Sequence, residues 1–147
     1  GMWDKTDENL LHTALRETHE EIGVAPHLVE PIAMLPVASP KRRSLLVTPF
    51  VGIAHSPLEL KAEVSEIAAI FDAPLSTFMD TDQYQYFEMK SPVGSLSFPY
   101  LTYKGYKIWG FTLKVLVDML NATLDAGIDL KYPSDAYIEE LRKRGQQ

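Results

Sequence analysis

The chain has 147 residues, a length typical of one compact domain, so we expect a single domain over residues 1–147. With 14 Lys and Arg against 20 Asp and Glu, the formal net charge is −6, which argues against general nucleic-acid binding. The lack of cysteine excludes disulfides, thiolate metal sites and cysteine nucleophiles. No apolar run approaches the roughly 20 residues that a membrane helix needs. We therefore expect a cytoplasmic protein without membrane contact.

The first predicted element is an amphipathic helix over residues 7–22. Asp7 is its predicted N-cap, and Gly23 is expected to end it in a left-handed conformation. Apolar residues recur at three- and four-residue steps, which predicts one buried face. That face consists of Leu10, Leu11, Ala14, Leu15, Thr18 and Ile22.

Short apolar segments follow the helix, and two of them, 32–35 and 45–53, are predicted to be buried strands. Residues 66–71 are compatible with a further strand, and 73–78 resemble a helical turn that starts at a proline, so the choice between strand and helix stays open there.

The second half of the chain is rich in aromatic residues, which favour strands over 84–89 and 97–103. Lys104 and Gly105 then predict a tight turn into 106–109, and so a hairpin. Apolar spacing predicts a helix over 111–124 that ends near Gly127, and a short charged helix over 133–144. Helix, strands and helix in this order indicate an α+β fold.

The segment that carries chemistry runs Arg16-Glu17-Thr18-His19-Glu20-Glu21-Ile22-Gly23-Val24. At about 100° per residue, Glu17, Glu20 and Glu21 fall on one side of the helix. Like charges at this spacing repel by a few tenths of a kcal/mol, a cost that a bound cation removes. Hard divalent ions such as Mg²⁺ prefer carboxylate oxygens and substrate phosphates. The alternative is a solvated acidic face with Arg16 as an ion-pair partner, and spacing alone does not decide between them.

The order of residues is more specific, because 16–24 resembles the R-E-U-x-E-E-x-G-U core of the Nudix hydrolase motif, with Thr18 at an apolar position. Glu8 lies at the expected E-x7-R position, while Gly1 precedes it by one residue too many and instead stands in G-x5 spacing to Asp7. Residues 13–17 and 108–112 also resemble the coenzyme A diphosphatase branch of that family.

This resemblance implies a Nudix-like α/β/α sandwich with a mixed sheet and hydrolysis of a nucleoside diphosphate linked to another group. It implies Mg²⁺ or Mn²⁺ held by Glu17, Glu20 and Glu21, with the Gly1 carbonyl as a further ligand. One of these carboxylates would double as a proton acceptor, and Arg16 would hold a carboxylate of the motif in place. The implied substrate is a nucleotide-type pyrophosphate, with coenzyme A as one candidate.

Residues outside the motif are candidates for the remaining roles. Nudix folds often use a further glutamate as base or ligand, and Glu63 and Glu66 are the candidates, although an exposed structural role suits either. The basic residues Lys41, Arg42 and Arg43 would meet substrate phosphates by charge-assisted hydrogen bonds, or else form a solvated loop.

Nudix domains normally carry strands before the motif, so the resemblance implies a domain truncated at its N-terminus. Such a sheet would expose an unpaired edge, and we expect a second copy to cover it in a homodimer. A different class of function also fits this sequence: a Nudix-like fold kept as a binding or assembly module with weak or no catalysis.

Overall fold

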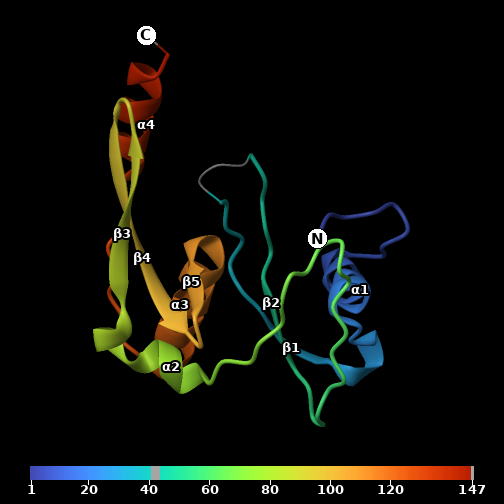
Figure 1. Cartoon of the computed structure of the whole chain (residues 1–147). Helices are drawn as coiled ribbons and strands as arrows, with labels where there is room; N and C mark the ends of the chain where they lie inside the picture. The colour runs from blue at the N-terminus through green and yellow to red at the C-terminus, as the bar shows by residue number, and fades with distance from the viewer. Residues whose placement is uncertain (41–43, 147) are drawn as a thin grey trace. The chain divides into compact units, whose positions relative to one another are not determined.

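The computed structural model describes residues 1–40 and 44–146, and it comprises two compact units, Gly1–Asp72 and Ala73–Gln147 (Figure 1). We call them the N-terminal unit and the C-terminal unit, and consider each by itself. Helices and small antiparallel sheets confirm the α+β class. Every strand pair among the described residues is antiparallel, so the mixed sheet stays a prediction. The α/β/α layering and the single domain over residues 1–147 also stay predictions.

The N-terminal unit contains one long helix and a short strand pair. Its elements are α1 (Leu10–Ile22), the 3₁₀ turn η1 (Pro26–Leu28), β1 (Glu30–Met34) and β2 (Phe50–Ile53). Strand β1 pairs antiparallel with β2, with a register shift between Pro31 and Ala33. The observed strand β2 begins at Phe50 and is shorter than the predicted strand over 45–53.

Helix α1 ends where the sequence predicts but begins later. Gly23 has a φ of 76° and its N–H donates to the His19 carbonyl, which confirms the predicted left-handed end. The prediction of Asp7 as N-cap was wrong, because Asn9 caps the helix by accepting a 2.9 Å hydrogen bond from the His12 N–H.

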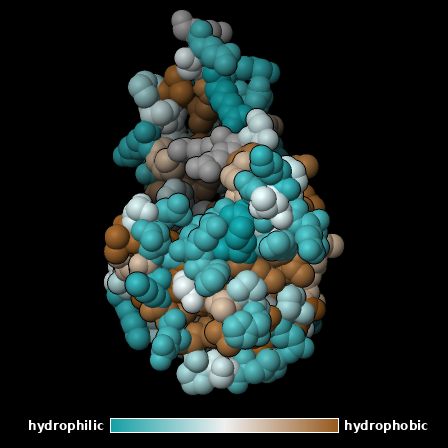
Figure 2. Space-filling view, turned by 90° about the vertical axis from the view of Figure 1, so that its right-hand side faces the viewer, coloured by the Kyte–Doolittle hydropathy of each residue, from teal (hydrophilic) through white to brown (hydrophobic). Residues whose placement is uncertain are grey.

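The expected burial was wrong for Leu10 and for the first predicted strand, whereas the other residues of the predicted apolar face of α1 are partly buried. Leu10 on α1 is 50% exposed and every residue of β1 is exposed, whereas Asp7, Thr13 and Val24 are buried. Amphipathic spacing predicts which side of an element is apolar, but burial also needs a second layer of structure over that side. Figure 2 shows hydrophobic residues at the surface among hydrophilic ones on the face that it presents.

The C-terminal unit contains a larger antiparallel sheet and the longest helix among the described residues (Figure 1). Its elements are α2 (Leu75–Met79), the 3₁₀ turn η2 (Thr81–Gln83), β3 (Gln85–Ser91), β4 (Gly94–Tyr103), β5 (Tyr106–Trp109), α3 (Gly110–Leu124) and α4 (Asp135–Arg144). The strands pair in the order β3-β4-β5. These elements confirm the predicted strands and helices, and α2 shows that the segment after Pro74 is helical. Residues 66–71 form neither helix nor strand.

The turn between β4 and β5 has the geometry that the sequence predicts. Lys104 and Gly105 have φ angles of 49° and 81°. Positive φ at both central residues is what a two-residue hairpin turn requires, because it matches the twist of the strands. The turn brings Tyr103 opposite Tyr106 and so fixes the register of the hairpin.

The hydrophobic core of the C-terminal unit lies between α3 and one face of the sheet. The core side chains are Phe78, Leu101, Leu113, Val117, Leu120 and Ile128. The other face carries the aromatic rings of Phe87, Phe98, Tyr100 and Trp109, and the Lys107 ammonium lies 3.6 Å from the Phe87 ring centroid. This cation–π contact partly covers an aromatic face with a lysine side chain.

Candidate active site on helix α1

The centre of this site is an ion pair between the buried Asp7 and the partly buried Arg16. Arg16 Nε donates to Asp7 Oδ1 at 2.8 Å, and Arg16 Nη2 donates to Asp7 Oδ2 at 3.0 Å. Asp7 is only 6% exposed, and it also accepts hydrogen bonds of 2.9 Å from the Thr13 hydroxyl and the Asp4 N–H. A carboxylate that is buried and accepts four donors holds its position firmly.

This network shifts the ionisation of both partners. The hydrogen bonds from Arg16 hold the pKa of the Asp7 carboxyl well below its usual range, against the opposing effect of desolvation. The same bonds raise the pKa of the Arg16 guanidinium above its usual value. Both groups therefore stay charged across the physiological pH range.

Arg16 also reaches the carboxylates of the motif. Its Nη1 lies 3.3 Å from Glu17 Oε1 and 3.2 Å from Glu20 Oε2, and its Nη2 donates to the Met2 carbonyl at 3.0 Å. The Glu17 side chain is 20% exposed, whereas that of Glu20 is 59% exposed. Arg16 thus links the buried Asp7 to two glutamates of the predicted metal site.

The segment 61–66, which contains the candidate glutamates Glu63 and Glu66, lies at the C-terminal end of α1 (Figure 1). The Lys61 N–H donates to the Ile22 carbonyl at 2.9 Å, and the Glu63 N–H donates to the Glu21 carbonyl at 2.8 Å. The structure therefore brings the backbone of Glu63 beside a glutamate of the motif, 42 positions earlier in the chain. Glu66 follows one turn later, where its N–H donates to the Glu63 carbonyl at 3.0 Å.

Gly1 lies directly against the Glu17 side chain. A Cβ built on Gly1 would stand 1.9 Å from Glu17 Cγ, so a larger residue there would displace the glutamate. The predicted residues Gly1, Arg16, Glu17 and Glu20 are thus neighbours. The predicted phosphate-binding residues Lys41, Arg42 and Arg43 lie outside the described residues.

The glutamates of this site offer carboxylate oxygens, which are the ligands that a hard divalent cation prefers. Their arrangement fits less well: within residues 1–40 and 44–146, no three His, Asp or Glu side chains are grouped as a metal site. Arg16 Nη1 donates hydrogen bonds to Glu17 Oε1 and Glu20 Oε2, so these oxygens face the arginine and not a common metal position. Glu20, whose side chain is 59% exposed, is the more accessible of the two glutamates that Arg16 contacts.

The role of Asp7 is the feature that the sequence analysis missed. Glu8 stands at the motif position eight residues before Arg16, yet its residue is exposed and its N–H donates to His12 Nδ1 at 3.1 Å. The neighbouring Asp7 forms the ion pair with Arg16 instead. The available signal was that Asp7 and Glu8 are adjacent acidic residues just before the helix, either of which is close enough in sequence to pair with Arg16.

Comparison with known proteins agrees with the motif, although no family model matches the chain. The chain is 33% identical over 119 residues to the uncharacterized Nudix hydrolase NudL of Enterobacter sp. (strain 638), and 32% identical to the proteins of that name from Salmonella newport (strain SL254) and Salmonella paratyphi B. The matched stretch covers 81% of this chain and 62% of each relative's length. The chain thus carries a Nudix-like motif and is similar to Nudix hydrolases over most of its residues, and it spans about three fifths of the length of the relatives that it matches.

Proposed function

We propose that this chain belongs to a metal-dependent hydrolase that cleaves the pyrophosphate bridge of a nucleoside diphosphate linked to another group, with coenzyme A or a related compound as substrate. The observation that supports this most is the set of glutamates on α1 with Arg16 anchored among them by buried Asp7. The Nudix hydrolases that it resembles support the general class of reaction. A cytoplasmic location is part of the same proposal.

Bound Mg²⁺ or Mn²⁺ would screen the charged phosphate oxygens and make a nearby water easier to deprotonate. Glu17, Glu20 and Glu21 would hold the cation. Glu63, whose backbone contacts Glu21, or Glu66 would accept the proton of the attacking water. Lys41, Arg42 and Arg43 would bind the substrate phosphates.

Arg16 would act as a positioning residue. Its guanidinium fork is fixed on Asp7, so Nη1 can hold Glu17 while Glu20 is released to the cation. The positive charge of Arg16 would also limit the repulsion between the glutamates before the cation binds.

A turnover assay tests this proposal. The chain is incubated with coenzyme A, ADP-ribose or dinucleotide polyphosphates and Mg²⁺ or Mn²⁺, and the products are separated by chromatography. We expect Glu20→Gln to reduce turnover by about 10²-fold or more, while Glu59→Gln, an exposed glutamate of the same unit, leaves it unchanged. Equal product from wild type and Glu20→Gln would refute the proposal.

A second candidate is a binding or assembly module that has given up catalysis. It is favoured by the hydrogen bonds of Arg16 to Glu17 and Glu20, which satisfy these carboxylates without a cation. Under this alternative, none of the pyrophosphates is cleaved with either metal.

We also propose that a second copy covers the exposed strand pair of the N-terminal unit. Ile32, Met34 and Ile53 on β1 and β2 are 52%, 68% and 41% exposed, and an exposed apolar strand favours edge pairing. Sedimentation velocity should show a dimer that Met34→Glu dissociates. Leu124→Glu, at another exposed apolar position, should leave the dimer intact. A wild-type monomer at high concentration would contradict this part of the proposal.

A further inference from the structure

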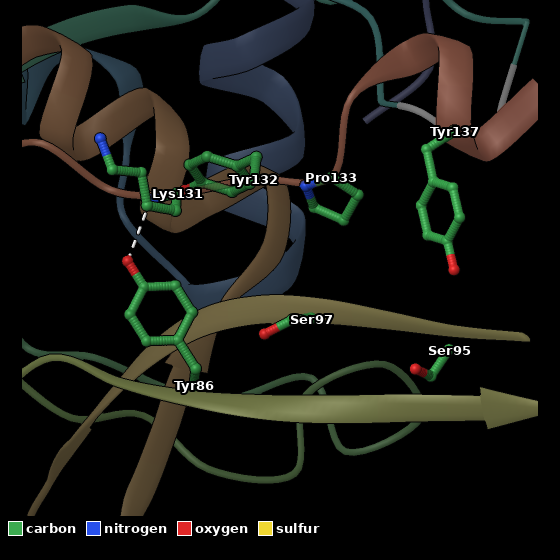
Figure 3. Close-up of a pocket in the computed structure, with 7 residues that line it drawn as sticks. All are labelled: Tyr86, Ser95, Ser97, Lys131, Tyr132, Pro133 and Tyr137. Carbon is green, nitrogen blue, oxygen red and sulfur yellow. Dashed lines mark hydrogen bonds between the residues drawn. The ribbon is translucent and has the colours of Figure 1, made fainter.

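The C-terminal unit contains a small cavity that the reaction proposed above does not use. Its volume is about 270 Å³, and its walls come from β3, β4, the segment 131–133 and α4 (Figure 3). The lining residues are Tyr86, Ser95, Ser97, Lys131, Tyr132, Pro133 and Tyr137. Because all of them belong to the C-terminal unit, this unit forms the cavity by itself.

The polar groups of the cavity are mainly hydroxyls. Ser95 and Ser97 are two positions apart on β4, so they lie on the same face of the sheet. Within the part of the chain that the structure describes, no protein group bonds to their hydroxyls or to that of Tyr137. The Tyr86 hydroxyl accepts a 3.0 Å hydrogen bond from the Lys131 N–H, as Figure 3 shows, and it still has its own proton to donate.

Tyr132 lines this cavity and carries a buried hydroxyl. Among the described residues, its hydroxyl is buried without a hydrogen-bond partner. Burial raises the pKa of Tyr132 to about 12, so the hydroxyl keeps its proton at neutral pH. The cavity therefore offers the ring of Tyr132 to a ligand, and the accessible hydroxyls are those of the other lining residues.

Charge and size restrict what this cavity can bind. Among the described residues that line it, the one cationic side chain is Lys131, and its pairing with Asp129 at 2.5 Å makes the cavity less favourable for an anion. Within the part of the chain that the structure describes, no carboxylate lines the cavity, so a cation is not favoured either. The volume lies just below the roughly 300 Å³ at which pockets for drug-sized ligands begin, which suits a single ring.

We propose that this cavity binds a neutral polyhydroxylated ring, either a free monosaccharide or the sugar of a larger molecule. The rings of Tyr86, Tyr132 and Tyr137 would cover the apolar faces of the sugar ring. The serine hydroxyls would exchange hydrogen bonds with the hydroxyls of the ligand. The cavity is open and partly exposed, so we expect millimolar affinity.

Titration of the full chain, followed by amide chemical shifts, tests this proposal. The probes are D-glucose and D-ribose, with adenosine as a larger molecule that carries ribose. Sorbitol provides similar hydroxyls without a ring, and phenol provides a ring with a single hydroxyl. We expect saturable shifts at Ser95, Ser97 and Tyr137 with a ring sugar, and weaker shifts with both controls. Tighter binding of adenosine than of D-ribose would identify the sugar as part of a nucleoside.

The variants Ser97→Ala and Tyr137→Ala should each weaken this binding about threefold to tenfold, as expected for the loss of one hydrogen bond or ring contact. Ser76→Ala and Tyr106→Phe, outside the cavity, should not change it. Amide spectra of each variant report whether the fold is intact. The proposal is overturned by an absence of saturable shifts with both sugars and adenosine, by an equal response to sorbitol or phenol, or by unchanged affinity in both cavity variants.

Discussion

The Asp7 carboxylate accepts two parallel hydrogen bonds from the Arg16 guanidinium, at 2.8 and 3.0 Å, and thereby fixes the arginine that contacts Glu17 and Glu20. Asp7 precedes α1 and Arg16 lies in the middle of this helix, so the pair also fastens the segment before the helix to the helix itself. The buried Thr13 hydroxyl completes this arrangement by donating to the same carboxylate.

The Asp7 pair predicts a specific pH dependence of stability. The folded-state pKa of Asp7 lies below the ordinary value of 3.8, so its contribution to stability is complete above that value and is lost as the pH falls through the folded-state pKa. Asp7→Asn should therefore destabilise the chain at pH 7 and flatten the decline of stability in acid. Urea unfolding between pH 2.5 and 7 measures both effects, with Asp72→Asn, an exposed aspartate of the same unit, as control. Parallel pH profiles for wild type and Asp7→Asn would contradict this prediction.

The core of the C-terminal unit predicts a large effect at Leu113 on α3. This side chain is fully buried, at 0% exposure, so Leu113→Ala removes apolar contacts and leaves a cavity. We expect a loss of about 2–5 kcal/mol in the free energy of unfolding. Leu124→Ala, on the same helix but 58% exposed, should change it by less than about 1 kcal/mol. The measurement is urea denaturation, and similar losses for the two variants would show that α3 does not pack as the structure has it.

The turn between β4 and β5 predicts opposite effects of two substitutions. Gly105 has a φ of 81°, so Gly105→Ala should cost about 1–2 kcal/mol, although a Cβ there meets no atom within 4 Å. Lys104 has a φ of 49°, and Lys104→Asn should raise stability because asparagine tolerates this conformation better. Thermal unfolding of both variants checks the signs. A neutral Gly105→Ala would mean that the turn relaxes to another geometry.

The features that the sequence predicted correctly are those that local chemistry determines. Gly23 ends α1 because its left-handed conformation depends on its own backbone, and the Lys104–Gly105 turn follows the same rule. The exposed β1 and the half-exposed Leu10 were missed, because burial depends on the elements that pack against them. The role of Arg16 in holding a carboxylate of the motif stays a prediction from the resemblance, and the sequence could not say that buried Asp7 pairs with Arg16, since that depends on how the chain enters the helix.

The most direct test of the central claim is Mn²⁺ binding to the chain, measured by electron paramagnetic resonance of the free ion during titration. Because α1 carries the three glutamates, we predict a saturable site in wild type that Glu20→Gln weakens by about tenfold or more, and that Glu59→Gln leaves unchanged. Equal Mn²⁺ affinity of wild type and Glu20→Gln would show that α1 does not bind the cation and would contradict the account.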